Sequence, residues 1–233
     1  MSQIIRRRFP VLLPLVLFAA LVIFTSVHAK SPRGPNSNNH RSIVTKAKRY
    51  GLVELKSAVP GVHVDLQYTV TSASGKPLYL KDMPCLVNRS TSEKLRKAQR
   101  ELKKQGYALK VWDAWRPPEA HLALWDAVKD PKYVVPPSKG LSLHCYGIAV
   151  DLTIVKADGS PLKMPSKFDE FSSKAASKYA GSDQEIAANL EKLQAAMRNA
   201  GFRIIKSEWW HFDDLKAKGV RRVNAENLGI RMP

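Results

Sequence analysis

The sequence has few of the residues that hold small secreted domains together. It contains two cysteines among 233 residues, too few for a disulfide framework or a four-cysteine zinc cluster. Acidic residues are also scarce, since 20 Asp and Glu oppose 38 Lys and Arg and give a formal net charge of +18. Twelve glycines without any repeat exclude a collagen-like chain. Long apolar runs are missing except near the N-terminus, which argues against a multi-pass membrane protein.

The body of the chain has the composition of a folded protein. Hydrophobic residues make up 44% and charged residues 25% of the sequence, which argues against global disorder. The length fits one globular domain with an accessory segment better than two full domains.

The N-terminal segment has the three parts of a secretory signal peptide. Three consecutive arginines precede a long apolar run, and small residues follow it. We predict a signal peptide over residues 1–29 and a secreted or periplasmic protein; if the signal is not cleaved, the apolar run would anchor the chain in a membrane. Its removal would leave a net charge of +15. Residues 30–45, rich in Ser, Pro, Asn and basic side chains, are predicted to form a flexible basic linker before a folded domain over residues 46–233.

Hydrophobic periodicity indicates strands and helices in irregular alternation. A two-residue period is typical of a half-buried strand, and recurrence at three and four residues is typical of a helix. The expected strands cover residues 62–68, 107–115, 148–155 and 202–205. The expected helices run from the capping boxes at Ser90 and Ser182 to Gly106 and Gly201, and over residues 118–129. Because these elements lack a regular βαβ order, we predict an α+β fold with a largely antiparallel central sheet flanked by helices.

Two of the six histidines lie near acidic residues and are the candidates for chemistry. Gly147 permits a tight bend, so His144 can fold back towards Asp151 on the following strand. His211 lies three residues after Glu208, with two tryptophans between them. His28 in the predicted signal segment and His40 in the predicted linker are not expected to be functional. His63 and His121 are expected to be exposed or to have an ordinary hydrogen-bond partner.

These residue types suit a catalytic zinc site. Two imidazoles and one carboxylate are ligands of the kind found in zinc sites that keep an open position for water. Such a centre lowers the pKa of its water to about 7. Glu208 is then a spare acid that can take the proton of this water. Taken alone, the spacing leaves open ordinary hydrogen-bonded packing at strand ends.

The motifs together resemble the VanX-type D-alanyl-D-alanine dipeptidases, zinc peptidases of the hedgehog/D-Ala-D-Ala peptidase fold. The resemblance covers roughly residues 62–211 and depends on four ordered motifs. They are residues 112–117 (WDAWRP), 142–153 (SLHCYGIAVDLT), 164–169 (MPSKFD) and 208–211 (EWWH). The chain departs from the family pattern at residues 71–76, which lack the usual Asn and Phe, and at Ala114, where Gly is usual.

The resemblance implies three groups of site residues. The implied metal ligands, for one Zn²⁺ per chain, are His144, Asp151 and His211. The implied catalytic residues are Glu208, as general base, and Arg116, as the group that stabilises the oxyanion. The implied substrate-binding residues are Asp169, for the ammonium group, and Tyr68 and Ser142, for the walls of the pocket.

Three functions remain to be separated. The resemblance implies zinc-dependent hydrolysis of D-alanyl-D-alanine, or a similar small dipeptide, in cell-wall or D-alanine metabolism. The alternative is a peptidoglycan D,D-carboxypeptidase or endopeptidase with the same zinc site, since a basic exported protein suits an anionic cell-wall polymer. The third is a basic binding module without catalysis, although the charges lack the interleaved aromatics expected of a nucleic-acid partner. Export would also permit Cys85 and Cys145 to pair, a question that the sequence leaves open.

Overall fold

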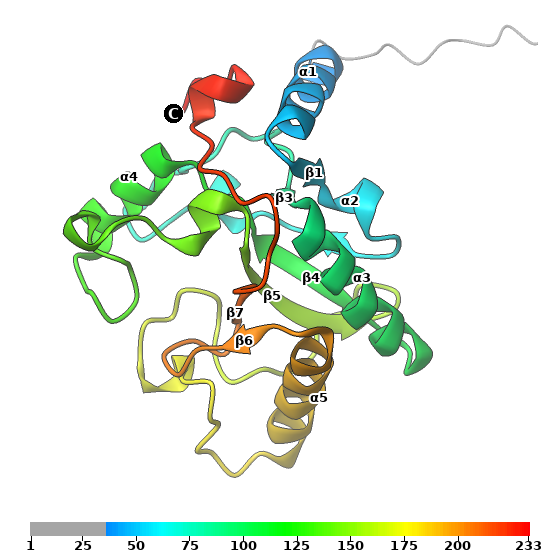
Figure 1. Cartoon of the computed structure of the whole chain (residues 1–233). Coiled ribbons are helices and arrows are strands. Elements are labelled where there is room, and N and C mark those ends of the chain that lie inside the picture. Colours follow the sequence, from blue (N-terminus) through cyan, green and yellow to red (C-terminus); the bar gives the residue numbers. More distant parts are fainter. Residues whose placement is uncertain (1–35) are drawn as a thin grey trace, which may run out of the picture. The chain divides into compact units, whose positions relative to one another are not determined.

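Helices and strands alternate irregularly along the described part of the chain (Figure 1). The computed structural model describes residues 36–233; the predicted signal peptide and residues 30–35 of the predicted linker lie outside the described residues. The α-helices are α1 (Asn36–Arg49), α2 (Leu55–Ala58), α3 (Arg89–Lys104), α4 (Pro118–Val128) and α5 (Gln184–Ala200). The strands are β1 (Leu52–Glu54), β2 (His63–Val64), β3 (Leu86–Asn88), β4 (Tyr107–Asp113), β5 (Ala149–Lys156), β6 (Arg203–Ile204) and β7 (His211–Asp213). No helix of residues 36–233 combines the length and the apolar character that crossing a membrane requires.

The central sheet has five strands in the order β2-β4-β5-β7-β6, and β1 pairs with β3 separately. β2 runs parallel to β4, whereas the other pairings of the central sheet are antiparallel. Between β2 and β4 the chain crosses over through α3, the kind of connection that parallel neighbours need. The predicted α+β fold is confirmed, but the predicted largely antiparallel sheet is confirmed only in part because the sheet is mixed.

The register of three neighbouring strands places three polar side chains in one row. A shift in the pairing of β4 with β5 brings Asp113 opposite Asp151. On the other side of β5, Asp151 lies opposite His211 of β7. Directly opposite residues of adjacent strands point to the same face of a sheet. The sheet alone therefore brings these three residues together.

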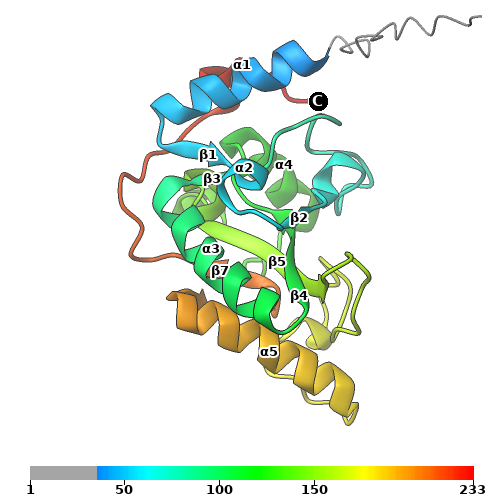
Figure 2. The same ribbon diagram turned by 90° about the vertical axis from the view of Figure 1, so that its right-hand side faces the viewer.

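The core is formed by helices that pack on the sheet and on each other. α3 contacts β4 and α5, and α5 also contacts β5 and β6 (Figure 2). Leu95 and Leu102 of α3 and Leu193 and Met197 of α5 are fully buried, as their helical spacing predicts. Both helices thus present an apolar face to the core and fix the sheet beneath the site.

Both of these helices begin at caps other than the predicted serines. The side chain of Asn88, rather than Ser90, caps α3 by accepting a hydrogen bond from the Ser90 backbone N–H. Asp183, rather than Ser182, caps α5. Asn and Asp cap helices as well as Ser does, so a nearby residue with the required extended backbone takes the position.

The strand predicted over residues 62–68 is wrong in its length. Only His63–Val64 pairs with β4, and the chain then turns into the 3₁₀ helix η1 (Gln67–Thr69). Leu66 and Tyr68 are still buried. The alternating pattern therefore reports burial here and not a continuous strand.

The flexible linker predicted over residues 30–45 is wrong for residues 36–45, which belong to α1. Ile43 and Ala47 of this helix are buried, and α1 contacts β1 and the 3₁₀ helix η5 (Ala225–Leu228) near the C-terminus (Figures 1 and 2). His40 also bonds to Glu54, with 2.8 Å between Nε2 and Oε1. A few apolar side chains in a polar background carried too weak a sequence signal for this tertiary contact to be predicted.

Candidate metal centre and active site

One cavity of about 210 Å³ brings the predicted site residues together. It lies beside the row of side chains on β5 and β7, and the loops after α4 and before η4 (Ser173–Ala175) contribute to its walls. All eight residues implied by the sequence line it: Tyr68, Arg116, Ser142, His144, Asp151, Asp169, Glu208 and His211. These residues come from segments up to 143 positions apart, so the fold and not the local sequence assembles them.

The three candidate metal ligands form a tight cluster at the base of this cavity. One ligand atom from each of His144, Asp151 and His211 lies within 4.8 Å of the others. The Oδ1 atom of Asp151 is 2.9 Å from Nδ1 of His211, and its Oδ2 atom is 3.3 Å from Nε2 of His144. The two imidazole nitrogens are 3.2 Å apart. Two imidazoles and one carboxylate at this spacing match the donor set of a catalytic zinc site.

A sharp bend gives His144 its orientation. Ser142 caps the 3₁₀ helix η3 (Leu143–Tyr146), and Gly147 ends it with a left-handed φ of 66°, as the predicted bend requires. A Cβ atom at Gly147 would also lie 2.7 Å from a methyl carbon of Leu52. Both the left-handed backbone and the lack of space therefore favour glycine at this position. The Nδ1 atom of His144 is 2.8 Å from the backbone oxygen of Ala114. Because a carbonyl only accepts, Nδ1 carries the proton and Nε2 faces the cluster with its lone pair.

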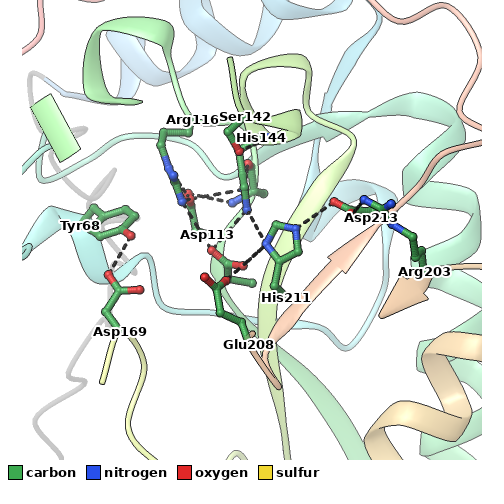
Figure 3. Close-up of polar contacts among 12 residues, drawn as sticks. Tyr68, Asp113, Arg116, Ser142, His144, Asp169, Arg203, Glu208, His211 and Asp213 are labelled. Carbon is green, nitrogen blue, oxygen red and sulfur yellow. Dashed lines mark hydrogen bonds and ion pairs between the residues drawn. The ribbon is translucent and has the colours of Figure 1, made fainter. Parts of the chain in front are cut away.

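His211 is oriented by a side chain instead. Its Nε2 atom is 2.8 Å from Oδ1 of Asp213, two residues further along β7 (Figure 3). This carboxylate accepts a hydrogen bond from the Nε2–H group, and Nδ1 faces Asp151 and His144. A metal ion bound here would replace the proton on Nδ1 of His211, and His144 and His211 would then each present one ring nitrogen to it.

The charges around His211 favour a cation in the cluster. Burial lowers the pKa of His211, but its hydrogen bonds to Asp151 and Asp213 outweigh this effect and raise the pKa well above its ordinary value. For Asp151 burial acts in the opposite direction and raises the pKa, but the neighbouring imidazoles, above all His144, outweigh it and hold the pKa below its usual range. A buried group of carboxylates that stabilises positive charge fits a divalent ion.

Glu208 stands beside the cluster without belonging to its hydrogen bonds. Its Oε2 atom is 3.8 Å from Nδ1 of His211, and only 6% of the residue is exposed. Burial, with a further contribution from Asp151, raises the pKa of Glu208 to about 8. Trp209 and Trp210, which follow it in the sequence, are fully buried. A carboxyl with a pKa near neutrality is suited to accepting and returning a proton.

Asp113 is a site residue that sequence reasoning missed. It is fully buried, and its Oδ2 atom accepts hydrogen bonds from Nε and Nη2 of Arg116 at 2.9 and 2.6 Å. Its Oδ1 atom accepts from the hydroxyl of Tyr79 and from the backbone N–H of Ala114. These bonds hold one edge of the Arg116 guanidinium, and Arg116 lines the cavity. An acid three residues before the predicted arginine was the signal available.

The opposite end of the cavity carries Asp169. Its Oδ2 atom accepts a hydrogen bond from the hydroxyl of Tyr68 at 2.8 Å (Figure 3), and its backbone has a left-handed φ of 56°, which side-chain-bearing residues seldom adopt. Burial raises its pKa to about 7, although the Tyr68 bond acts the other way. Strained backbone at a cavity wall often marks a functional position.

Two loops close the cavity above Asp169. The rings of Tyr133 and Phe171 stack with centroids 4.6 Å apart and planes 24° apart, and the Tyr133 hydroxyl donates to the backbone oxygen of Ser172. Both rings line the cavity. This contact could not be predicted from local sequence patterns, because it joins residues 38 positions apart in two irregular segments.

His121 and both cysteines are buried titratable groups near the site or in the core. His121 was expected to be exposed or to have a partner, which is wrong: it is fully buried, and neither ring nitrogen has a hydrogen-bond partner in the described part of the chain. Burial, with the nearby charge of Arg116, lowers its pKa to about 4. The two cysteines, whose pairing the sequence leaves open, are buried and unpaired: Cys85 and Cys145. Burial raises the pKa of the Cys145 thiol to about 12.

Fold and site together define a metal-dependent hydrolase: a mixed sheet offers two histidines and a carboxylate to one small cavity, with a spare buried glutamate beside them. The profile of the D-ala-D-ala dipeptidase family matches residues 48–227. The chain therefore belongs to this family of metallopeptidases.

Named relatives agree with this family. The D-alanyl-D-alanine dipeptidase of Escherichia coli K12 is 34% identical over 163 residues, which cover 70% of this chain and 83% of the relative. The dipeptidase of the same name from Enterococcus faecium is 30% identical over 182 residues, and that of Enterococcus faecalis V583 is 27% identical over 182. Each Enterococcus match covers 70% of this chain and 90% of the relative.

Proposed function

We propose that this protein hydrolyses D-alanyl-D-alanine to two free amino acids with one Zn²⁺ ion held by His144, Asp151 and His211. The observation that carries the proposal is the convergence of these three side chains within 4.8 Å beside the buried carboxyl of Glu208. When bound, the zinc ion would lower the pKa of a water molecule and polarise the scissile carbonyl. The remaining chemistry belongs to residues of the chain.

Glu208 acts as the general base and then as the general acid. It takes a proton from the attacking water and later delivers it to the nitrogen of the leaving amino acid. Its raised pKa, about 8 with the site as described, falls when a divalent cation binds nearby, since opposite charge favours the carboxylate. With the cation bound the carboxyl is therefore ionised and can accept the proton of the water.

Arg116 stabilises the negative charge that develops on the carbonyl oxygen. Asp113 holds its Nε and Nη2 atoms, so the guanidinium is fixed beside the cavity that it lines. A donor fixed before the reaction begins loses no energy to reorientation in the transition state. Since Arg116 is 6% exposed, water competes little for this bond.

Asp169 sets the length of the substrate. Its carboxylate can pair with the ammonium group of a free dipeptide, whereas an acylated amine offers no charge to it. The cavity of about 210 Å³ is also smaller than the roughly 300–1,000 Å³ of sites for drug-sized ligands. The hydroxyl of Ser142, which lines the cavity near His144, is available to the other end of the dipeptide.

We also propose that the enzyme acts outside the cytoplasm. The signal-like composition of residues 1–29 and the positive charge of the rest of the chain support this. An anionic cell-wall polymer is then a natural neighbour, and contact with a membrane would depend on an uncleaved signal segment. Fractionation of cells that express the full chain tests the location.

Hydrolysis of a matched substrate panel tests the activity. The purified protein is expected to cleave D-alanyl-D-alanine, to leave L-alanyl-L-alanine and N-acetyl-D-alanyl-D-alanine largely intact, and to lose activity reversibly with a zinc chelator. Equal rates on the free and the acetylated dipeptide would favour the wall-directed carboxypeptidase or endopeptidase instead. Protein that binds no zinc and cleaves none of these compounds would refute both.

A further inference from the structure

A row of hydrogen-bonded side chains extends from the candidate metal ligands to the surface. His211 donates through Nε2 to Oδ1 of Asp213 at 2.8 Å, and Arg203 donates through Nε and Nη2 to Oδ2 of the same carboxylate at 3.1 and 2.5 Å. Figure 3 shows the three residues in line, on the side of His211 away from His144. Each oxygen of Asp213 thus has its own partner.

The pairing of the strands fixes the positions of Asp213 and Arg203 in this row. Arg203 of β6 lies opposite Asp213 of β7 in the antiparallel register, and Asp213 lies opposite Ala149 of β5. Asp213 is 2% exposed, so its carboxylate cannot exchange these partners freely for water. Half of the Arg203 side chain, by contrast, is exposed, with 53% of its surface accessible.

A histidine that binds a metal ion through one ring nitrogen usually has a hydrogen-bond partner at the other. The hydrogen bond on that nitrogen selects the tautomer and the ring angle, and its loss typically weakens metal affinity about 10- to 100-fold. For His144 this partner is the backbone oxygen of Ala114, which no substitution can remove. For His211 the partner is the side chain of Asp213, which Arg203 holds in turn.

We propose that Asp213 and Arg203 are positioning residues of the metal centre. Asp213 keeps His211 in the tautomer that turns Nδ1 towards the ion, and Arg203 keeps the carboxylate rotated so that Oδ1 faces His211. The inference rests on the zinc site of the proposed function. It differs from a purely structural role, in which the Arg203–Asp213 pair only fastens β6 to β7.

Zinc affinity of the purified full chain, measured by chelator competition at one fixed pH, tests the inference. Asp213→Leu is expected to weaken zinc binding about 10- to 100-fold, and Asp213→Asn, which keeps an acceptor oxygen, to restore part of the loss. Arg203→Met should weaken binding less than Asp213→Leu, and Arg203→Lys should lie between Arg203→Met and the wild type. The absorption spectrum of the cobalt-substituted protein should change in the same order, because it reports ligand geometry.

Arg198→Met provides the matched control. It breaks an ion pair with Glu191 of the same 2.5 Å length, on a face of α5 that does not line the cavity, and should leave affinity and spectrum unchanged. Wild-type affinity and spectrum in Asp213→Leu would overturn the inference, even if its melting temperature falls. If Asp213→Leu does not fold, unchanged values in Arg203→Met overturn it. A wild-type protein that binds no zinc would instead overturn the proposed function itself.

Discussion

The two walls of the cavity are built in different ways. Along one wall Asp151 and His211 sit on paired strands at opposed positions, and 4% and 12% of their side-chain surfaces are exposed. Along the other wall Asp169 and the Tyr133–Phe171 stack come from irregular segments, and Asp169 is half-buried with a left-handed backbone. We call these the sheet wall and the loop wall.

The difference separates two tasks. Metal binding and proton transfer tolerate little displacement, so rigid paired strands suit the groups that perform them. Recognition of the substrate needs a surface that differs among related enzymes, and loops vary more easily than strands. We expect substitutions in the sheet wall to lower kcat or stability, and substitutions in the loop wall to change KM and selectivity.

Glu208→Gln should have the largest effect on turnover. The amide keeps the shape of the side chain but cannot accept a proton, so kcat should fall about 10²- to 10⁴-fold. Zinc content, measured by atomic absorption, should remain at one ion per chain, because Glu208 is not a ligand. Turnover near that of the wild type would remove Glu208 from the mechanism and weaken the contrast between the walls.

Asp113→Asn should reduce stability most. The substitution leaves the buried charge of Arg116 with only the more distant carboxylate of Asp151, whose Oδ2 atom is 3.5 Å from Nη2, and breaking a buried ion pair costs about 3–5 kcal/mol. Urea denaturation of the zinc-loaded protein measures this loss of unfolding free energy. Glu101→Gln is the control, since it breaks an exposed pair with Lys104 and should cost no more than about 1 kcal/mol. Equal effects of the two substitutions would show that the sheet wall does not depend on Asp113.

Elements with a strong local signal could be predicted from the sequence. The helices α3 and α5 and the strands β4 and β5 carry regular apolar spacing, and the structure places them within a few residues of expectation. The helix α1 could not be predicted, because its burial depends on contact with η5 almost 180 positions later. The parallel pairing of β2 likewise depends on a crossover and not on the two residues that pair.

The same distinction holds for the site. Motifs in the sequence located the eight residues that the structure gathers in one cavity, but not the partners that hold them. Asp213 could have been found, since residues two apart on a strand share a face with His211. The stack of Tyr133 on Phe171 and the unpartnered burial of His121 could not, because neither follows from any local pattern.

Asp169→Asn should act on the loop wall alone. The substitution removes a charge-assisted contact with the substrate ammonium, worth about 1.5–3 kcal/mol, so KM for the free dipeptide should rise roughly 10- to 150-fold. The rate constant kcat should change much less. Rates on free and N-acetylated D-alanyl-D-alanine measure the outcome, and a variant that still prefers the free dipeptide would exclude Asp169 as the ammonium partner.

The pH dependence of KM sharpens the same assignment. The pKa of Asp169 is raised to about 7, so the group becomes neutral as the pH falls below that value and can no longer pair with an ammonium ion. The substrate amine, with a pKa near 8, gains charge by no more than about twofold as the pH falls from 8 to 6, which is too little to reverse this effect. KM of the wild type should therefore rise between pH 8 and pH 6, whereas KM of Asp169→Asn should change by no more than about twofold.

Tyr133→Leu should have the smallest effect and tests how far the loop wall can change. The substitution keeps apolar bulk but removes the stack on Phe171, a contact worth about 0.5–1.5 kcal/mol beyond its buried area. KM should rise about 2- to 12-fold, and the enzyme should begin to accept a tripeptide, since the two loops are no longer held together above Asp169. An unchanged kcat with altered selectivity supports the division between the walls. A fall in kcat as large as that of Glu208→Gln would mean that the loops also hold the reacting groups in place, and the division would not stand.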